Sequence, residues 1–178
     1  MRYFLTLLAC LPISASADPL VTAEAFIDAF YSWDRQTLEN TLTSDTQGAE
    51  QVLYYQGWAE GGNYAIQNRR PCAWAEEEIQ CPITVTDDFG KTLGYTATDT
   101  FHLTIQDSKV ASVRFTADDP PIFSELQAWM MAERPGIFAG PCKDFFAGGT
   151  TPGDCARAVA NAAREFMAKR GQSLDADD

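Results

Sequence analysis

The first third of the chain has the hydrophobic spacing of helices. Thr22 is expected to cap a helix over residues 23–33, whose apolar stripe consists of Phe26, Ile27, Phe30 and Tyr31. Asp34 is expected to cap a second, short helix. Residues 49–55 extend this helical layer, and residues 64–68 form one further helical turn. Three glycines between them are expected to interrupt the layer: Gly57, Gly61 and Gly62.

From residue 72 onward the hydrophobic period changes from 3.6 to 2, which is typical of strands. Apolar residues alternate with polar ones around residue 83, over 95–106 and over 109–116, with turns at 88–91 and 107–109. The clearest strand presents on one face Tyr95, Ala97, Asp99, Phe101, Leu103 and Ile105. Helices followed by an antiparallel meander predict an α+β fold, with the helices packed on a curved sheet.

The last third returns to helical patterns. One helix is expected from Pro120 to the Pro135–Gly136 pair, and another from Asp154 to Gly171, followed by a disordered acidic tail over 171–178. Residues 18–119 carry 6 basic and 17 acidic groups, whereas residues 120–170 carry 6 and 5. The final helix, with Arg157, Arg164, Lys169 and Arg170, is therefore expected to dock on the acidic domain of its own chain.

The overall charge excludes some functions. The 178 residues contain 13 Lys and Arg against 25 Asp and Glu, a formal net charge of −12. Nucleic acids and anionic membrane surfaces are recognised by clustered basic residues, so neither is expected as a partner.

The first 17 residues have the pattern of a signal peptide. Arg2 is followed by an apolar stretch over residues 3–13 and by the small-residue cleavage pattern Ala15-Ser16-Ala17. A lipoprotein processing site at Cys10 is the less favoured alternative, because almost no apolar region precedes it. The sequence predicts a periplasmic or secreted protein, with no membrane association after cleavage.

Cleavage would leave four cysteines, an even number that predicts two disulfides in an oxidising compartment. Three pairings can be formed. Cys72–Cys81 and Cys142–Cys155 are favoured because each closes a short loop, worth roughly 3 kcal/mol through chain entropy. No metal site is expected, since there is no C-x-x-C pair and His102 is the only histidine. No cofactor motif is found.

The pattern Phe30-x-x-x-Asp34-x-x-x-Leu38-x-x-x-Leu42-x-x-Asp45 resembles the start of NTF2-like (SnoaL-like) domains. The resemblance covers about residues 22–117. It implies a domain over 18–119 in which a curved sheet wraps the first helix into a cone with a pocket at its open end. Residues 120–170 have no counterpart in the minimal fold and form a C-terminal helical extension.

Asp99 is the candidate catalytic residue. The alternation of the strand places the carboxyl of Asp99 among apolar neighbours. Burial would raise the pKa of this carboxyl into the range of a general acid or base. The resemblance implies the same role, because NTF2-like isomerases and dehydratases use an acid on the inner wall of the cone. Alternatively, Asp99 lies at the cone mouth or pairs with Arg69, Arg70 or Arg114. His102 falls on the opposite face of the strand, so the two residues form no dyad.

Aromatic residues crowd the region beside the expected cone mouth, where they either line a pocket for a small apolar ligand or fill the core. The predicted lining consists of Tyr54, Trp58, Tyr64, Trp74, Tyr95 and Phe101; Tyr55 belongs to the same crowd. The acidic pair Asp87-Asp88 is interpreted as turn and cap residues.

The sequence favours a non-catalytic, exported protein that binds a small apolar ligand or interacts with a protein. The protein partner would be an envelope protein or a second copy, held by the C-terminal extension. The alternative is a lyase, isomerase or hydrolase that uses Asp99.

Overall fold

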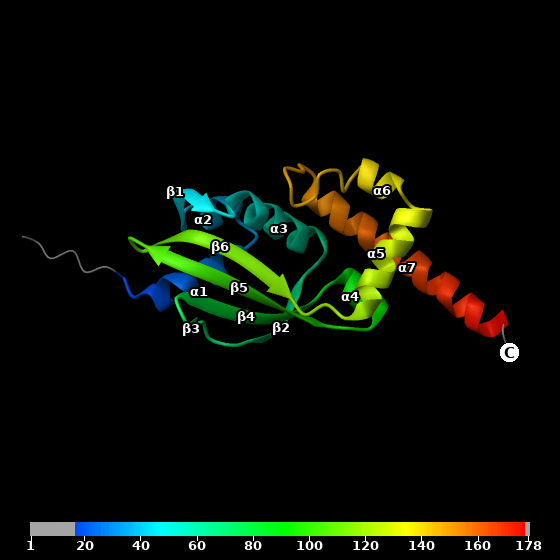
Figure 1. Cartoon of the computed structure of the whole chain (residues 1–178), viewed down its shortest axis with the longest axis horizontal. Coiled ribbons are helices and arrows are strands. Elements are labelled where there is room, and N and C mark those ends of the chain that lie inside the picture. The colour runs from blue at the N-terminus through cyan, green and yellow to red at the C-terminus, as the bar shows by residue number, and fades with distance from the viewer. Residues whose placement is uncertain (1–16, 177–178) are drawn as a thin grey trace, which may run out of the picture.

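The computed structural model describes residues 17–176, and side chains as far as Gly171. Almost all of the predicted signal peptide lies outside the described residues. The chain is α+β, as predicted, and Figure 1 shows the arrangement of its elements. In chain order these are α1 (Pro19–Phe30), α2 (Arg35–Glu39), β1 (Leu42–Gln47), α3 (Ala49–Gly61), β2 (Ala65–Arg69), β3 (Ala73–Ala75), β4 (Glu78–Thr86), α4 (Asp88–Leu93), β5 (Ala97–Gln106), β6 (Lys109–Ala117), α5 (Pro121–Glu133), α6 (Gly136–Ala139) and α7 (Pro152–Ala176).

The sheet is open and has the strand order β1-β6-β5-β4-β2, with the short β3 paired to β4. The predicted antiparallel meander corresponds to β4, β5 and β6. The sheet as a whole is mixed, however, because β1 pairs in parallel with β6. No strand was predicted over residues 42–47.

The predicted alternation is confirmed in β4 and β5, whereas in β6 the buried residues Val110 and Val113 are three apart because the register with β5 shifts. On β4 the buried face consists of Ile79, Cys81, Ile83 and Val85, and on β5 it consists of Ala97, Asp99, Phe101 and Leu103. The α1 helix lies against this face, where Phe26 and Phe30 place their rings 5.8 and 4.9 Å from the ring of Phe101. The core is therefore aromatic where helix and sheet meet.

The helix caps differ in one case from the prediction. Asp18, not Thr22, caps α1: its side chain accepts a hydrogen bond from the Leu20 amide, and Pro19 occupies the first helical position. The prediction for α2 is confirmed, since Asp34 accepts bonds from the amides of residues 36 and 37.

Two further segments differ from the expected structure. Residues 64–68 were expected to be helical, but Ala65–Arg69 forms strand β2 at the edge of the sheet. Its residues are mostly exposed on both faces, so no alternating pattern marks it. The predicted turn at 88–91 is the short helix α4, which Asp87 caps and which Gly94 ends with a φ of 80°.

Of the three glycines expected to interrupt the helical layer, Gly57 and Gly61 lie within α3, and Gly62 is the C-cap that ends it. Gly57 and Gly61 are four residues apart and allow α7 to approach closely. A Cβ atom on Gly61 would lie 2.3 Å from the Cα of Gly153, and one on Gly57 would lie 2.7 Å from Cγ of Pro152. These glycines serve a contact between helices rather than a break in one helix.

The C-terminal extension, α5 to α7, lies at one end of the sheet, away from β3 (Figure 1). The α7 helix packs on α3 and α4 through an apolar face of Cys155, Ala156, Val159, Ala160 and Ala163. The final helix thus docks on the acidic domain, as predicted, but its ion pairs lie elsewhere: Lys169 and Arg170 pair with Glu133 and Glu125 of α5.

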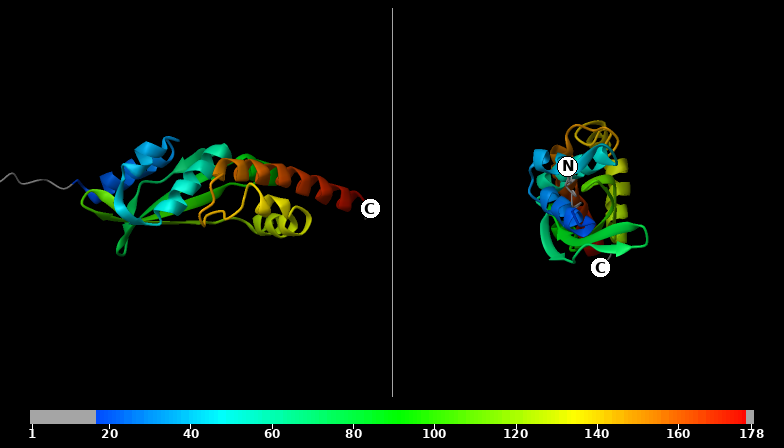
Figure 2. Two further views of the ribbon diagram at one scale, coloured as in Figure 1. Left: turned by 90° about the horizontal axis from the view of Figure 1, so that it is seen from above. Right: turned by 90° about the vertical axis from the view of Figure 1, so that its left-hand side faces the viewer.

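The α7 helix is also longer than expected. It does not end at Gly171 but continues to Ala176, along the long axis of the molecule (Figure 2). Residues 177–178 of the predicted tail lie outside the described residues. Within the described part of the chain, no helix has the length and apolarity needed to cross a bilayer.

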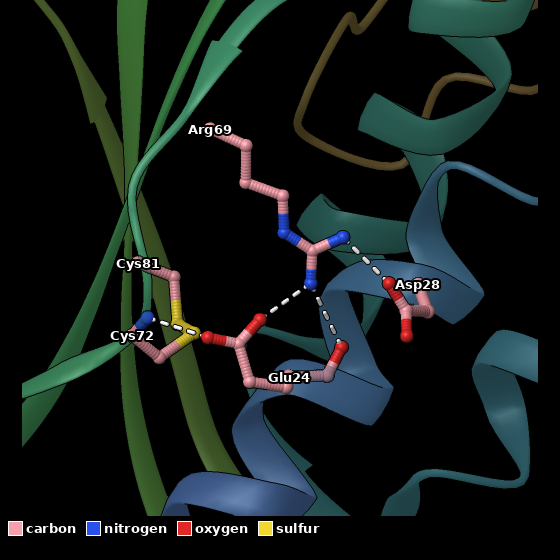
Figure 3. Close-up of a disulfide and its surroundings, with 5 residues drawn as sticks. All are labelled: Glu24, Asp28, Arg69, Cys72 and Cys81. Carbon is pink, nitrogen blue, oxygen red and sulfur yellow. Dashed lines mark hydrogen bonds and ion pairs between the residues drawn. A yellow bond between two sulfur atoms is a disulfide. The ribbon is translucent and has the colours of Figure 1, made fainter.

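Both predicted disulfides are present, Cys72–Cys81 and Cys142–Cys155. The first lies beside α1, as Figure 3 shows. There Glu24 accepts a hydrogen bond from the Cys72 amide at 2.6 Å and pairs with Arg69, which also reaches Asp28 at 2.5 Å. The ion pairs and this hydrogen bond attach the β2–β3 segment to the first helix, and the disulfide attaches the same segment to β4.

Candidate functional site

A cavity of about 180 Å³ lies where residues 18–119, which we call the core domain, meet the C-terminal extension. Its core-domain wall includes Tyr55, Trp58, Tyr64, Val85, Asp87, Phe89, Tyr95, Ala97, Asp99, Phe115 and Asp119. The extension supplies the rest, including Phe123, Met130, Phe138, Phe145, Phe146, Val159 and the Cys142–Cys155 disulfide. Ala117, Asp119 and Phe145 are exposed and mark where the cavity reaches the surface.

Asp99 lies in this cavity with only 3% of its surface exposed. The hydroxyl of Tyr55 donates a hydrogen bond to its Oδ2. Burial raises the pKa of Asp99 to about 7, and the charges of Asp119 and Asp118 act in the same direction, while the bond from Tyr55 lowers it. At neutral pH this carboxyl is therefore poised between its two protonation states.

The arginine partners considered for Asp99 lie elsewhere. Arg69 pairs with Glu24 and Asp28 on α1. Arg114 lies on the outer face of the sheet and pairs with Glu78 at 2.9 Å. The hydrogen-bond donor beside Asp99 is a phenol, so its carboxyl keeps a raised rather than a lowered pKa.

Tyr55 is held by stacking. Its ring lies 4.3 Å from that of Phe115 and 5.2 Å from that of Phe30, and burial raises its pKa well above the usual value. The hydroxyl therefore remains a donor at all physiological pH values. The sequence placed Tyr55 in the aromatic crowd but not in the predicted lining, because the rotation of α3 against the sheet decides which of two neighbouring tyrosines faces inward.

Asp87 is a second buried carboxyl in the same cavity, 4% exposed. Its Oδ1 accepts a hydrogen bond from the Gly90 amide at 2.6 Å, as the predicted cap should, but its Oδ2 is buried without a hydrogen-bond partner. Burial raises the pKa of Asp87 to about 7, and the bond from Gly90 lowers it less than burial raises it. Sequence reasoning identified the cap but missed the site residue.

The predicted lining residues divide into two groups. Trp58, Tyr64 and Tyr95 line the cavity. Tyr54 is buried with its ring 4.8 Å from that of Phe146, and Phe101 is fully buried in the core. Neither of these two lines the cavity.

Trp74 lies far from the cavity. It is 56% exposed on β3, which pairs with the start of β4 at Ile79, whereas the cavity begins at the other end of that strand, at Val85. The Cys72–Cys81 disulfide holds β3 at this distant end.

His102 lies on the outer face of β5, as the alternation predicted. Its Nδ1 is 2.6 Å from Glu78 Oε1, and its Nε2 is 3.1 Å from the hydroxyl of Thr116. Hydrogen bonds from Gln80 and His102 lower the pKa of Glu78 to about 2. The histidine and Asp99 point to opposite faces and form no dyad. Among the described residues, no group of three or more Asp, Glu, His or Cys side chains is arranged to hold a metal ion.

No protein-family model matches the chain, and no curated protein matches it. Solved structures similar to it include a cystatin-like-fold protein of unknown function from Xanthomonas campestris, with 16% identity over 56% of this chain and 90% of that one, at a TM-score of 0.44. A proposed polyketide cyclase from Sinorhizobium meliloti has 17% identity over 54% of this chain and 94% of that one, at a TM-score of 0.44. An NTF2-like protein of unknown function from Cytophaga hutchinsonii has 11% identity over 62% of this chain and 99% of that one, at a TM-score of 0.45. One of these similar structures is described as NTF2-like, the family that the sequence resembles.

Proposed function

We propose that this protein binds a small, predominantly apolar molecule in the cavity between the core domain and the C-terminal extension. The observation that supports this is the lining: aromatic and aliphatic side chains from both parts surround about 180 Å³ of space. An apolar cavity of about 150 Å³ is enough to hold a benzene ring. The expected ligand is therefore of the size of one substituted ring.

Polar groups at one side of the cavity would orient the ligand. Asp99, Asp87 and the phenol of Tyr55 are the buried polar groups of the lining, whereas the extension contributes mostly apolar surface. Ligand pockets commonly combine an apolar body with a few convergent polar groups. The apolar part of the ligand would face the extension, and its polar part would face β4 and β5.

Export to the periplasm or the exterior belongs to the same proposal. The predicted signal peptide and the two disulfides support an oxidising compartment. Interaction with an envelope protein or a second copy through the extension stays a prediction.

Binding can be tested by fluorine NMR with 4-fluorotoluene as the probe. Val159→Phe places a ring into the cavity and should abolish the broadening of the probe signal that the wild-type protein causes. Val21→Phe makes the same change at a position that is 62% exposed on α1, and serves as the matched control. Equal broadening by the wild type and by Val159→Phe would exclude this cavity as the binding site.

A second candidate function is acid–base catalysis at Asp99. It is favoured by a buried carboxyl in a cavity, with a pKa of about 7 and a phenolic donor beside it. Asp99→Asn should then abolish turnover of a substrate while leaving the binding of 4-fluorotoluene intact. Unchanged turnover in this variant would exclude the catalytic role.

A further inference from the structure

The acidic side chains that line the cavity have no basic partner among the described lining residues. Among the described residues that line it, three are aspartates, Asp87, Asp99 and Asp119, and none is a lysine, an arginine or a histidine. Two of these aspartates are almost fully buried. Buried charges are normally paired, because an unpaired charge in an apolar environment is costly.

One atom of this group lacks the partner that its chemistry requires. Only 4% of the Asp87 surface is exposed. Its Oδ1 accepts a hydrogen bond from the Gly90 amide, but its Oδ2 is buried without any hydrogen bond. A buried oxygen of this kind usually has a donor from the protein or from a bound molecule. This unpaired oxygen, Asp87 Oδ2, belongs to a residue that lines the cavity.

Aromatic rings surround the same part of the cavity. The Phe89 ring lies 6.3 Å from that of Trp58 and 6.3 Å from that of Tyr95, and all three line the cavity with Asp87. The faces of aromatic rings attract cations, and several rings together with a carboxylate are the arrangement by which proteins recognise ammonium groups.

We propose that the ligand of this cavity is a small organic cation, with a ring or alkyl body of about the size of benzylamine and an ammonium group placed beside Asp87. This rests on the proposed function and deepens it by naming the chemical class. The ammonium N–H groups would donate to Asp87 Oδ2, its charge would compensate the buried carboxylates, and Trp58, Phe89 and Tyr95 would enclose it. The apolar body would fill the space against Phe146 and Val159.

Other charge types fit the lining less well. An anionic ligand would meet three carboxyls and no basic side chain in the described lining. A neutral ligand with a hydroxyl would satisfy Asp87 Oδ2 but would leave the carboxyls without a compensating charge above pH 7, where they are ionised. The cation alone supplies both a donor and the opposite charge.

The test compares three probes of one shape: 4-fluorobenzylamine, 4-fluorobenzyl alcohol and 4-fluorobenzoate. Dissociation constants are measured by fluorine NMR at pH 8, where carboxyls with a pKa of about 7 are ionised. The amine should bind at least about tenfold more tightly than the alcohol, as one charge-assisted contact allows, and the benzoate should bind most weakly. Val159→Phe should abolish all of this binding.

Variants locate the ammonium group. Asp87→Asn retains an oxygen that can cap α4, and Asp87→Ser is a second neutral cap should Asn fail to fold. Either should remove most of the preference for the amine. Asp88→Asn deletes the same charge one residue away, outside the cavity lining, and should retain the preference.

The outcomes separate the two proposals. If the alcohol binds as tightly as the amine, or if the preference survives in the Asp87 variants, the cation is excluded while binding in the cavity stands. If no probe, 4-fluorotoluene included, binds in a manner that Val159→Phe removes, the proposed function fails, and the cation proposal fails with it.

Discussion

The buried carboxyl of Asp99 should make the protein less stable as pH rises, and Asp99→Asn should remove that loss. In the folded state burial raises the pKa of Asp99 from its ordinary 3.8 to about 7. Between these two values the folded protein keeps a proton that the unfolded chain releases. The free energy of unfolding therefore falls as pH rises through this window and levels off above pH 7.

The size of the effect follows from the difference between the two pKa values. One pKa unit corresponds to about 1.4 kcal/mol, so the full loss from Asp99 approaches about 4 kcal/mol, of which about 3 kcal/mol falls between pH 5 and pH 8. The Asn side chain is neutral and still accepts a hydrogen bond from Tyr55. Between pH 5 and pH 8, the wild type should therefore lose up to about 3 kcal/mol of its free energy of unfolding that Asp99→Asn retains. At pH 8 the variant should be the more stable of the two proteins.

The assay is urea unfolding of the wild type and the variant at pH 5, 6, 7 and 8. Glu78 stays ionised throughout this range because its pKa is lowered to about 2. Asp87 also lowers the free energy of unfolding as pH rises, and does so in both proteins, because its pKa is also raised to about 7. Asp107→Asn makes the same substitution at an exposed turn of the β5–β6 hairpin and should follow the wild type. A pH dependence equal in the wild type and in Asp99→Asn would refute the reasoning.

Three further perturbations test the role of the extension. Gly61→Ala should destabilise the protein by about 2 kcal/mol or more, because the new Cβ meets the α7 backbone. The control Gly136→Ala places a Cβ with nothing within 4 Å, so its urea unfolding midpoint should stay near that of the wild type while the midpoint of Gly61→Ala falls. Replacing Cys142 and Cys155 by Ser should lower the free energy of unfolding by roughly 3 kcal/mol and weaken probe binding, and unchanged probe binding would show that the disulfide does not maintain the cavity wall. Deleting residues 136–178 should abolish cooperative unfolding, because α7 covers the apolar face of α3; a cooperatively folded fragment on thermal unfolding would contradict this.

The strands could be predicted from the sequence because one face of each is buried. In β4 and β5 the alternation follows directly from the difference between core and solvent, so even the inward direction of Asp99 could be read from its neighbours. Strand β2 escaped prediction for the opposite reason, since its residues are exposed on both faces and have no alternating pattern.

The helices could be predicted in position but less well in extent. Asp34 was recognised as a cap because capping depends only on residues close in sequence. The glycines of α3 were interpreted as breaks because a local pattern contains no information about α7, the distant helix that requires them. The charge balance predicted that α7 docks on the acidic domain but not which ion pairs it forms, because total charge does not say which acids lie nearest; Lys169 and Arg170 lie nearest to acids of α5.

By itself, the sequence determined the α+β class, the inward face of the central strands, the two short-loop disulfides and the net negative charge, because each depends on residue type and near neighbours. The tertiary structure decided which aromatic residues face the cavity, that the extension forms one of its walls, and that Asp87 lies there with an unpaired oxygen. These features arise where segments far apart in the chain pack together, and the geometry of that packing is not contained in any local pattern.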